Sequence, residues 1–200
     1  WTKLNTHLGK TDVLTATYTL KIKDPVYQTI DWNTTEASVD FDNTAKVVLK
    51  DSPNDVIVTD SCTAHYPTGL LTKDAQMIES SGSELTYTIE VNPYKRDLVT
   101  GDELTLIDTI RSTYLSLEPE TLSVKNAETG ADLGKCWLIR NGGKEIIFTI
   151  PDETHVIITY VAKVTKYGDN IEVENEVELA GVANSKIADK EKFKIYDANM

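Results

Sequence analysis

Apolar and polar residues alternate along much of this chain in short runs, and turn residues separate these runs. Strict alternation is typical of a β-strand that buries one face. No long segment has the spacing of an amphipathic helix. The pattern therefore predicts an all-β protein, with strands at residues 14–22, 39–49, 56–59, 70–77, 85–91, 104–110, 122–125, 135–139, 145–150, 156–164 and 171–179.

The residues between the runs are strong turn formers. Asn92-Pro93 and Pro151-Asp152 end strands, because proline cannot donate a hydrogen bond to a strand ladder. Asn141-Gly142-Gly143 is a strong hairpin signal. Many short strands separated by such turns favour an immunoglobulin-like β-sandwich.

Three predicted strands within residues 70–182 carry a polar residue on their apolar face. Asn175 has the same phase as Val173 and Val177. Asp108 and Lys73 stand at the equivalent inward positions of the 104–110 and 70–77 strands. Burying a side-chain amide without partners costs roughly 2–7 kcal/mol, so these inward polar residues need an explanation.

Part of the pattern occurs twice. The 156–164 run matches the 14–22 run, tyrosine on tyrosine, and each precedes a strand with an inward asparagine, Asn175 or Asn43. Such a repeat is typical of tandem modules. We expect the lysine and acid that match Asn43 to lie upstream of this chain, and therefore no bond at Asn43. The predicted divisions are residues 1–60, the C-terminal strands of an incomplete module; 61–69, a linker; 70–182, a complete module; and 183–200, a tail leading to a next module.

Composition narrows the choice of partners. Lys and Arg number 20 and Asp and Glu 32, which gives a formal net charge of −12. Nucleic acid and anionic membranes attract clustered positive charge, so neither is an expected partner. No apolar run approaches the ~20 residues of a membrane span. Cys62 and Cys136 are too few for a disulfide framework or a zinc site, and we expect two thiols or a single bridge.

A buried lysine, acid and asparagine have a specific chemistry open to them. Burial lowers the pKa of a lysine and raises that of a carboxyl group, so both favour their neutral forms. A neutral amine is a nucleophile, and a carboxamide polarised by a neighbouring acid is an electrophile. Attack of Lys73 on Asn175, assisted by Asp108, would release ammonia and leave an isopeptide bond. Each molecule would react once, so the chain would not be an enzyme, and no cofactor is expected.

At these residues the chain resembles the D2-type isopeptide domains of Gram-positive surface proteins, which include collagen-adhesin A-like domains and fimbrial backbone pilins. The resemblance implies a cross-link between Lys73 and Asn175 with Asp108 as the catalyst. It also implies an extracellular, cell-wall-anchored structural protein whose partners are neighbouring modules and possible host matrix or glycan. The matching segments are Leu-Thr-Lys at 71–73, Leu-Thr-Tyr-Thr-Ile-Glu-Val-Asn-Pro at 85–93, Leu-Thr-Leu-Ile-Asp-Thr at 104–109, Ile-Thr-Tyr at 158–160 and Glu-Asn-Glu-Val-Glu-Leu at 174–179.

Each inward residue also has a structural interpretation. A buried amide such as Asn175 can hydrogen-bond to the backbone. An aspartate such as Asp108 can order a turn, and the long stem of Lys73 can carry its ammonium to solvent. The joint inward phase of all three favours the cross-link.

Other functions remain alternatives. An adhesin domain that binds a host protein or glycan is the main one. A hydrolase is disfavoured, because the chain has no Gly-x-Ser-x-Gly nucleophile elbow. Calcium could bind acidic loop residues, but these lack the spacing of a calcium loop, so no metal site is predicted. The acidic residues concerned are Asp24, Asp31, Glu36, Asp102 and Glu103.

Overall fold

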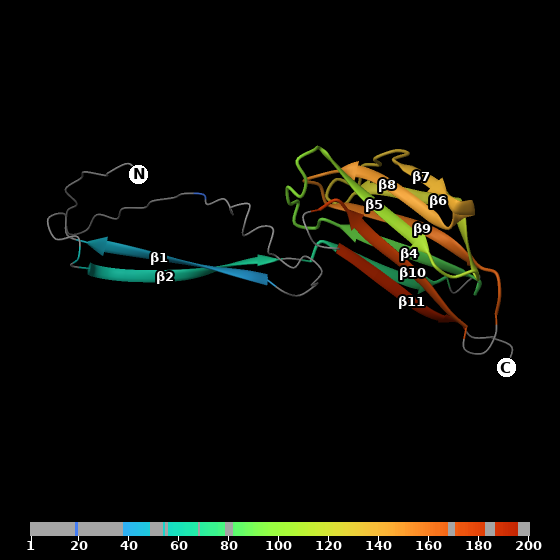
Figure 1. Cartoon of the computed structure of the whole chain (residues 1–200), viewed down its shortest axis with the longest axis horizontal. Helices are drawn as coiled ribbons and strands as arrows, with labels where there is room; N and C mark the ends of the chain where they lie inside the picture. The colour runs from blue at the N-terminus through green and yellow to red at the C-terminus, as the bar shows by residue number, and fades with distance from the viewer. Residues whose placement is uncertain are drawn as a thin grey trace.

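The computed structural model of the chain describes residues 19, 38–48, 54, 56–67, 69–78, 82–167, 171–182 and 187–195. The strands in this part of the chain form a two-stranded hairpin and two larger antiparallel sheets, as Figure 1 shows. The predicted 14–22 strand and the acidic residues Asp24, Asp31 and Glu36 lie outside the described residues.

The two larger sheets pack into a β-sandwich (Figure 1), which confirms the predicted immunoglobulin-like class. One sheet has the order β3-β4-β9-β6, and the other has the order β11-β10-β5-β8-β7. The four-stranded sheet consists of β3 (Leu71–Met77), β4 (Glu84–Val91), β6 (Leu115–Asn126) and β9 (Val156–Val164). The five-stranded sheet consists of β5 (Glu103–Ile110), β7 (Trp137–Arg140), β8 (Glu145–Pro151), β10 (Ile171–Ala180) and β11 (Ile187–Ile195).

Alternation along the strands gives each sheet one buried face. Every second side chain of β4 and of β5 is buried, and together the inward residues of both sheets make one hydrophobic core. The largest fully buried side chains include Tyr87, Tyr160 and Phe148. The rings of Tyr87 and Tyr160 stack with their centroids 5.3 Å apart, so β4 and β9 hold two aromatic rings at the centre of the core.

The predicted hairpin at Asn141-Gly142-Gly143 is confirmed. A short 3-10 segment, η1 (Asn141–Gly143), joins β7 to the antiparallel strand β8. All three of its residues have positive φ, which asparagine and glycine adopt more readily than other residues. β6 is longer than the predicted 122–125 strand. Its register with β9 shifts between Glu118 and Ser123. This irregularity interrupts the alternation of buried and exposed residues, so the first part of the strand was not predicted.

The two-stranded hairpin is built from β1 (Ser38–Val48) and β2 (Val56–Pro67). The prediction of a linker at 61–69 is wrong up to Pro67, because these residues pair with β1. The described side chains of β2 are exposed, so burial imposes no apolar periodicity from which its continuation beyond the predicted 56–59 strand could have been recognised.

The prediction that residues 183–200 form a tail toward a next module is wrong for β11. This strand pairs with β10 along nearly its whole length and forms an edge of the sandwich. Ile187 and Ile195 are each 1% exposed and belong to the core. Asn175 therefore lies on the penultimate strand of the sandwich rather than on the last.

The β1–β2 hairpin has the register of β10–β11. The pair Asn43 and Cys62 corresponds to Asn175 and Glu191. The pair Val47 and Val58 corresponds to Leu179 and Ile187. Both valines are 54% exposed, whereas Leu179 and Ile187 are each 1% exposed. The equivalence supports the predicted repeat, and the division of the chain into modules stays a prediction.

Candidate functional site

Three strands bring Lys73, Asp108 and Asn175 together inside the sandwich. Lys73 comes from β3 in the four-stranded sheet, whereas Asp108 and Asn175 come from the neighbouring strands β5 and β10 in the other sheet. Lys73 is 5% exposed as a residue and its side chain is 0% exposed, and Asp108 and Asn175 are each 0% exposed. The lysine stem therefore does not carry its amine to solvent.

The amine of Lys73 lies against the carboxyl group of Asp108. Lys73 Nζ donates to Asp108 Oδ2 over 2.6 Å. The amine also lies 5.1 Å and 5.4 Å from the ring centroids of Tyr87 and Tyr160, so two aromatic rings border it. The site is enclosed by apolar surface and by its own polar members.

A fourth polar residue, Tyr160 on β9, joins this group and was not singled out by the sequence. Its hydroxyl accepts from Lys73 Nζ at 3.1 Å and from Asn175 Nδ2 at 2.5 Å. The same hydroxyl donates to Asp108 Oδ2 over 2.7 Å. The position of Tyr160 on the buried face of β9 is also typical of an aromatic residue that only packs in the core. The signal that was available is the repeat, in which Tyr160 matches Tyr18.

Burial sets the ionisation of the group. Desolvation lowers the pKa of Lys73, although the neighbouring Asp108 opposes the shift. Desolvation likewise raises the pKa of Asp108, against the opposing effect of Lys73 and of hydrogen bonds with Tyr160 and Asn175. Both directions favour a neutral amine beside a protonated acid.

The hydrogen-bond inventory agrees with a protonated acid. Asp108 Oδ1 and Asn175 Oδ1 are buried and have no hydrogen-bond partner among the described residues. Two buried acceptors without a donor are costly. A proton on the Asp108 carboxyl group would convert one of these acceptors into a donor.

The opposite pKa shifts predict opposite pH dependences of stability. In Asp108→Asn the remaining Lys73 has a folded-state pKa below its ordinary value of 10.5. Below pH 10.5 the unfolded chain therefore binds more protons than the folded chain. The free energy of unfolding should rise with pH up to about 10.5. In Lys73→Met the remaining Asp108 has a folded-state pKa above its ordinary 3.8, so stability should fall as pH rises above that value. Urea unfolding from acid to alkaline pH measures both slopes, and slopes of the same sign would contradict the assignment.

The edge strand β11 closes the site on one side. The Oδ2 atom of Asp189 on β11 accepts a hydrogen bond from the backbone N–H of Lys73 over 2.7 Å. A side chain of the five-stranded sheet thereby binds β3, the edge strand of the four-stranded sheet. This role could not be predicted from the sequence, because Asp189 follows no apolar pattern.

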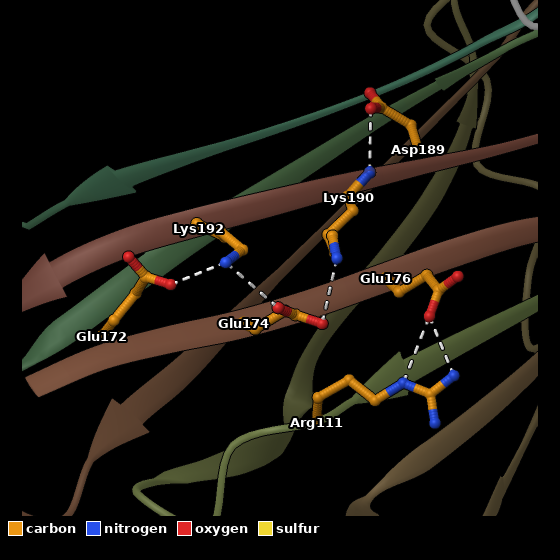
Figure 2. A network of polar contacts seen from close by, with 7 residues as sticks. All are labelled: Arg111, Glu172, Glu174, Glu176, Asp189, Lys190 and Lys192. Atoms are coloured by element: carbon orange, nitrogen blue, oxygen red, sulfur yellow. Dashed lines mark hydrogen bonds and ion pairs between the residues drawn. The ribbon is translucent and has the colours of Figure 1, made fainter.

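Ion pairs hold β11 to β10 on the outer face, as Figure 2 shows. Lys192 contacts Glu172 at 2.8 Å and Glu174 at 3.6 Å, and Lys190 contacts Glu174 at 3.4 Å. Arg111 also contacts Glu176 at 2.8 Å. Solvent screens exposed ion pairs, so this network supports the register of β11 more than the stability of the whole sandwich.

The remaining candidates stand apart from this group. Asn43 lies on the β1–β2 hairpin and is partly exposed. Cys62 and Cys136 are free thiols. Among the residues that the structure describes, Asp102 and Glu103 included, no group of three His, Cys, Asp or Glu side chains could hold a metal ion. None of the described helical segments is long and apolar enough to cross a membrane.

No family model matches the sequence, and the search of curated proteins found no match. Solved structures do match. The collagen-binding domain of a Staphylococcus aureus adhesin is 14% identical, with a TM-score of 0.52 over 64% of this chain and 98% of that domain. The sandwich has the fold of an adhesin domain. The sandwich also matches the collagen adhesin of S. aureus at 15% identity and a TM-score of 0.50, over 67% of this chain and 54% of that one.

A pilin is also among the solved structures that match the sandwich. The T6 backbone pilin of serotype M6 Streptococcus pyogenes is 14% identical, with a TM-score of 0.42 over 68% of this chain and 37% of the pilin. These neighbours are adhesin and pilin domains of Gram-positive surface proteins. At these identities the likeness concerns the fold alone.

Proposed function

We propose that the adhesin-like sandwich is a structural, stalk or pilin-like module that cross-links itself through an isopeptide bond between Lys73 and Asn175, with Asp108 as the catalytic acid and base. The observation that carries the proposal is the contact of a buried amine, a buried carboxyl group and a buried carboxamide around a single phenol oxygen. A structural role alone would be served at lower cost by apolar residues of similar size.

The reaction follows from the neutral forms that burial favours. The lone pair of Lys73 Nζ attacks Asn175 Cγ, while the acid proton of Asp108 stabilises the charge that develops on Asn175 Oδ1. The bond between Nζ and Cγ forms, and the bond between Cγ and Nδ2 breaks. One proton leaves Nζ and one reaches Nδ2, which departs as ammonia. The packed core holds the groups in contact, which supplies the proximity that such a reaction needs.

The bond would join the two sheets of the sandwich. Lys73 and Asn175 enclose a loop of about 100 residues, for which the chain-entropy model of cross-links gives about 4–5 kcal/mol. This stabilisation is large compared with the net stability of ordinary domains, about 5–15 kcal/mol. A covalent bond between sheets suits a protein whose task is to keep its shape.

The test is the intact mass of the purified chain. We expect a mass below that of the sequence by one ammonia, because the reaction releases one. Fragmentation of a digest should locate the link between the peptides that contain Lys73 and Asn175. The variant Asn175→Ala should show its full sequence mass. A wild-type mass equal to that of the sequence would refute the bond.

The cellular setting is part of the same proposal. We place the module in a cell-wall-anchored surface protein, outside the cell and beside neighbouring modules of the same chain. The fold of the Staphylococcus aureus neighbours supports this setting. The repeated register of the β1–β2 and β10–β11 hairpins supports the neighbouring modules.

A second candidate function is binding of a host matrix protein or glycan, because both of the Staphylococcus aureus neighbours are collagen-binding adhesins by name. Immobilised collagen and a glycan array test it directly. Saturable binding of the purified chain would favour this function, and binding no stronger than that of an unrelated β-sandwich would exclude these ligands.

A further inference from the structure

Tyr160 occupies the centre of the buried polar group. Its hydroxyl is within hydrogen-bonding distance of the nucleophilic nitrogen, of the carboxyl group and of the nitrogen that would leave. Tyr160 thus hydrogen-bonds to Lys73, Asp108 and Asn175 with a single oxygen. All three groups that take part in the proposed reaction therefore contact the hydroxyl of Tyr160.

The reaction needs a proton route from the amine of Lys73 to the leaving nitrogen of Asn175, and the contacts of Tyr160 form one. Asp108 Oδ2 contacts the amine of Lys73, from which a proton must leave. The hydroxyl of Tyr160 lies 2.5 Å from Asn175 Nδ2, to which a proton must be delivered. The same hydroxyl contacts Asp108 Oδ2, so it connects the two ends of the transfer.

The phenol is suited to carry a proton in both directions. Burial, with the neighbouring Asp108 acting in the same direction, raises the pKa of Tyr160 well above its ordinary value, so the hydroxyl keeps its proton. Its ring is held by stacking on Tyr87 at a centroid distance of 5.3 Å. A fixed, protonated hydroxyl can donate one proton as it accepts another.

We propose that Tyr160 is a catalytic residue of the cross-linking reaction, the relay that carries a proton from Asp108 to the departing nitrogen of Asn175. This inference rests on the proposed Lys73–Asn175 bond. As the bond between Nζ and Cγ forms, the proton lost by Nζ passes to Asp108 Oδ2. Asp108 gives a proton to the oxygen of Tyr160, and Tyr160 gives its own to Nδ2. Nδ2 leaves as ammonia, and Asp108 and Tyr160 end in the protonation states in which they began.

The test is the rate of ammonia loss in Tyr160→Phe. This substitution keeps the ring in the core and removes only the hydroxyl. The full chain is made by cell-free synthesis, synthesis is stopped, and the intact mass is followed with time. General acid–base catalysis contributes about 10²–10⁴-fold, so the conversion should slow by about 10²-fold or more.

Tyr114→Phe is the matched control. Tyr114 lies between β5 and β6, its ring centroid is 5.0 Å from Lys166 Nζ, and it is not part of the buried polar group. Removing its hydroxyl should leave the conversion rate unchanged. Circular dichroism and urea unfolding show whether both variants fold.

A second measurement separates proton transfer from packing. Site-specific replacement of Tyr160 by difluorotyrosine keeps the ring and its hydrogen bonds but makes the phenol more acidic. A relay predicts a shifted pH profile of the conversion rate, whereas a packing role predicts the wild-type profile. Conversion of Tyr160→Phe at the wild-type rate, or an unshifted profile, would overturn the relay while leaving the bond intact. A wild-type chain with its full sequence mass would instead overturn the bond itself.

Discussion

Asp108→Asn should leave the chain without its cross-link, and the intact mass should stay at the full sequence mass of the variant even after days of incubation. Asparagine has nearly the shape of aspartate, so the core should still close around it. It has no carboxyl group to take the proton from Lys73 Nζ, which lies 2.6 Å from Asp108 Oδ2. Loss of the shared acid and base affects both ends of the proton transfer, and the expected effect is therefore complete.

Asp152→Asn is the control for this substitution. Asp152 is a second buried aspartate, 9% exposed, and its Oδ2 accepts the backbone N–H groups of Leu98 and Val99 far from the site. An asparagine there keeps a carbonyl acceptor, so the cross-link should form as in the wild type. A complete cross-link in Asp108→Asn would show that the carboxyl group has no part in the chemistry.

Lys73→Met should lower the free energy of unfolding by about 4–5 kcal/mol, which is the stabilisation that the chain-entropy model assigns to closing a loop of about 100 residues. Methionine fills the space of the lysine stem without placing a charge in the core, so the loss reports mainly the missing bond. The melting temperature should fall by on the order of 15 °C. Denaturant unfolding and calorimetry measure the two quantities.

Lys163→Met provides the comparison for Lys73→Met. Lys163 lies on β9, and its side chain is exposed. The same chemical change there should alter stability by no more than about 0.5 kcal/mol. Equal stability of Lys73→Met and the wild type would mean that the wild-type chain carries no cross-link.

The inward phase of Asp108 and Asn175 could be predicted because both lie in strands with strict alternation. In β5 and β10 the buried and less buried positions alternate along most of the strand, so a polar residue on the wrong face stands out. Lys73 stands out in the same way, although β3 alternates over a shorter length. The sequence therefore revealed the three residues whose polarity conflicts with their position.

Tyr160 could not be singled out on this basis. A tyrosine on an apolar face satisfies the pattern, and only its hydroxyl distinguishes it from a packing residue.

Strand β11 was missed for a different reason, because both of its faces carry polar residues between the buried ends Ile187 and Ile195. A complementary charge pattern was present, since Lys190, Lys192 and Lys194 pair across the ladder with Glu176, Glu174 and Glu172. Alternating glutamates in residues 172–176 and alternating lysines in residues 190–194 were therefore the sequence signal from which β11 could have been predicted.

The position of β11 beyond Asn175 gives the proposed module two mechanical regimes. A pull on both ends would leave residues 73–175 locked by the cross-link. The described residues of 176–182 and 187–195 would be held only by hydrogen bonds, ion pairs and burial. At about 3.5 Å per extended residue, the 20 residues from 176 to 195 would lengthen by up to about 70 Å and then stop. In a chain of such modules, each module would extend by a limited length under a sudden load. It would refold when the load ends, while its cross-linked part stays folded.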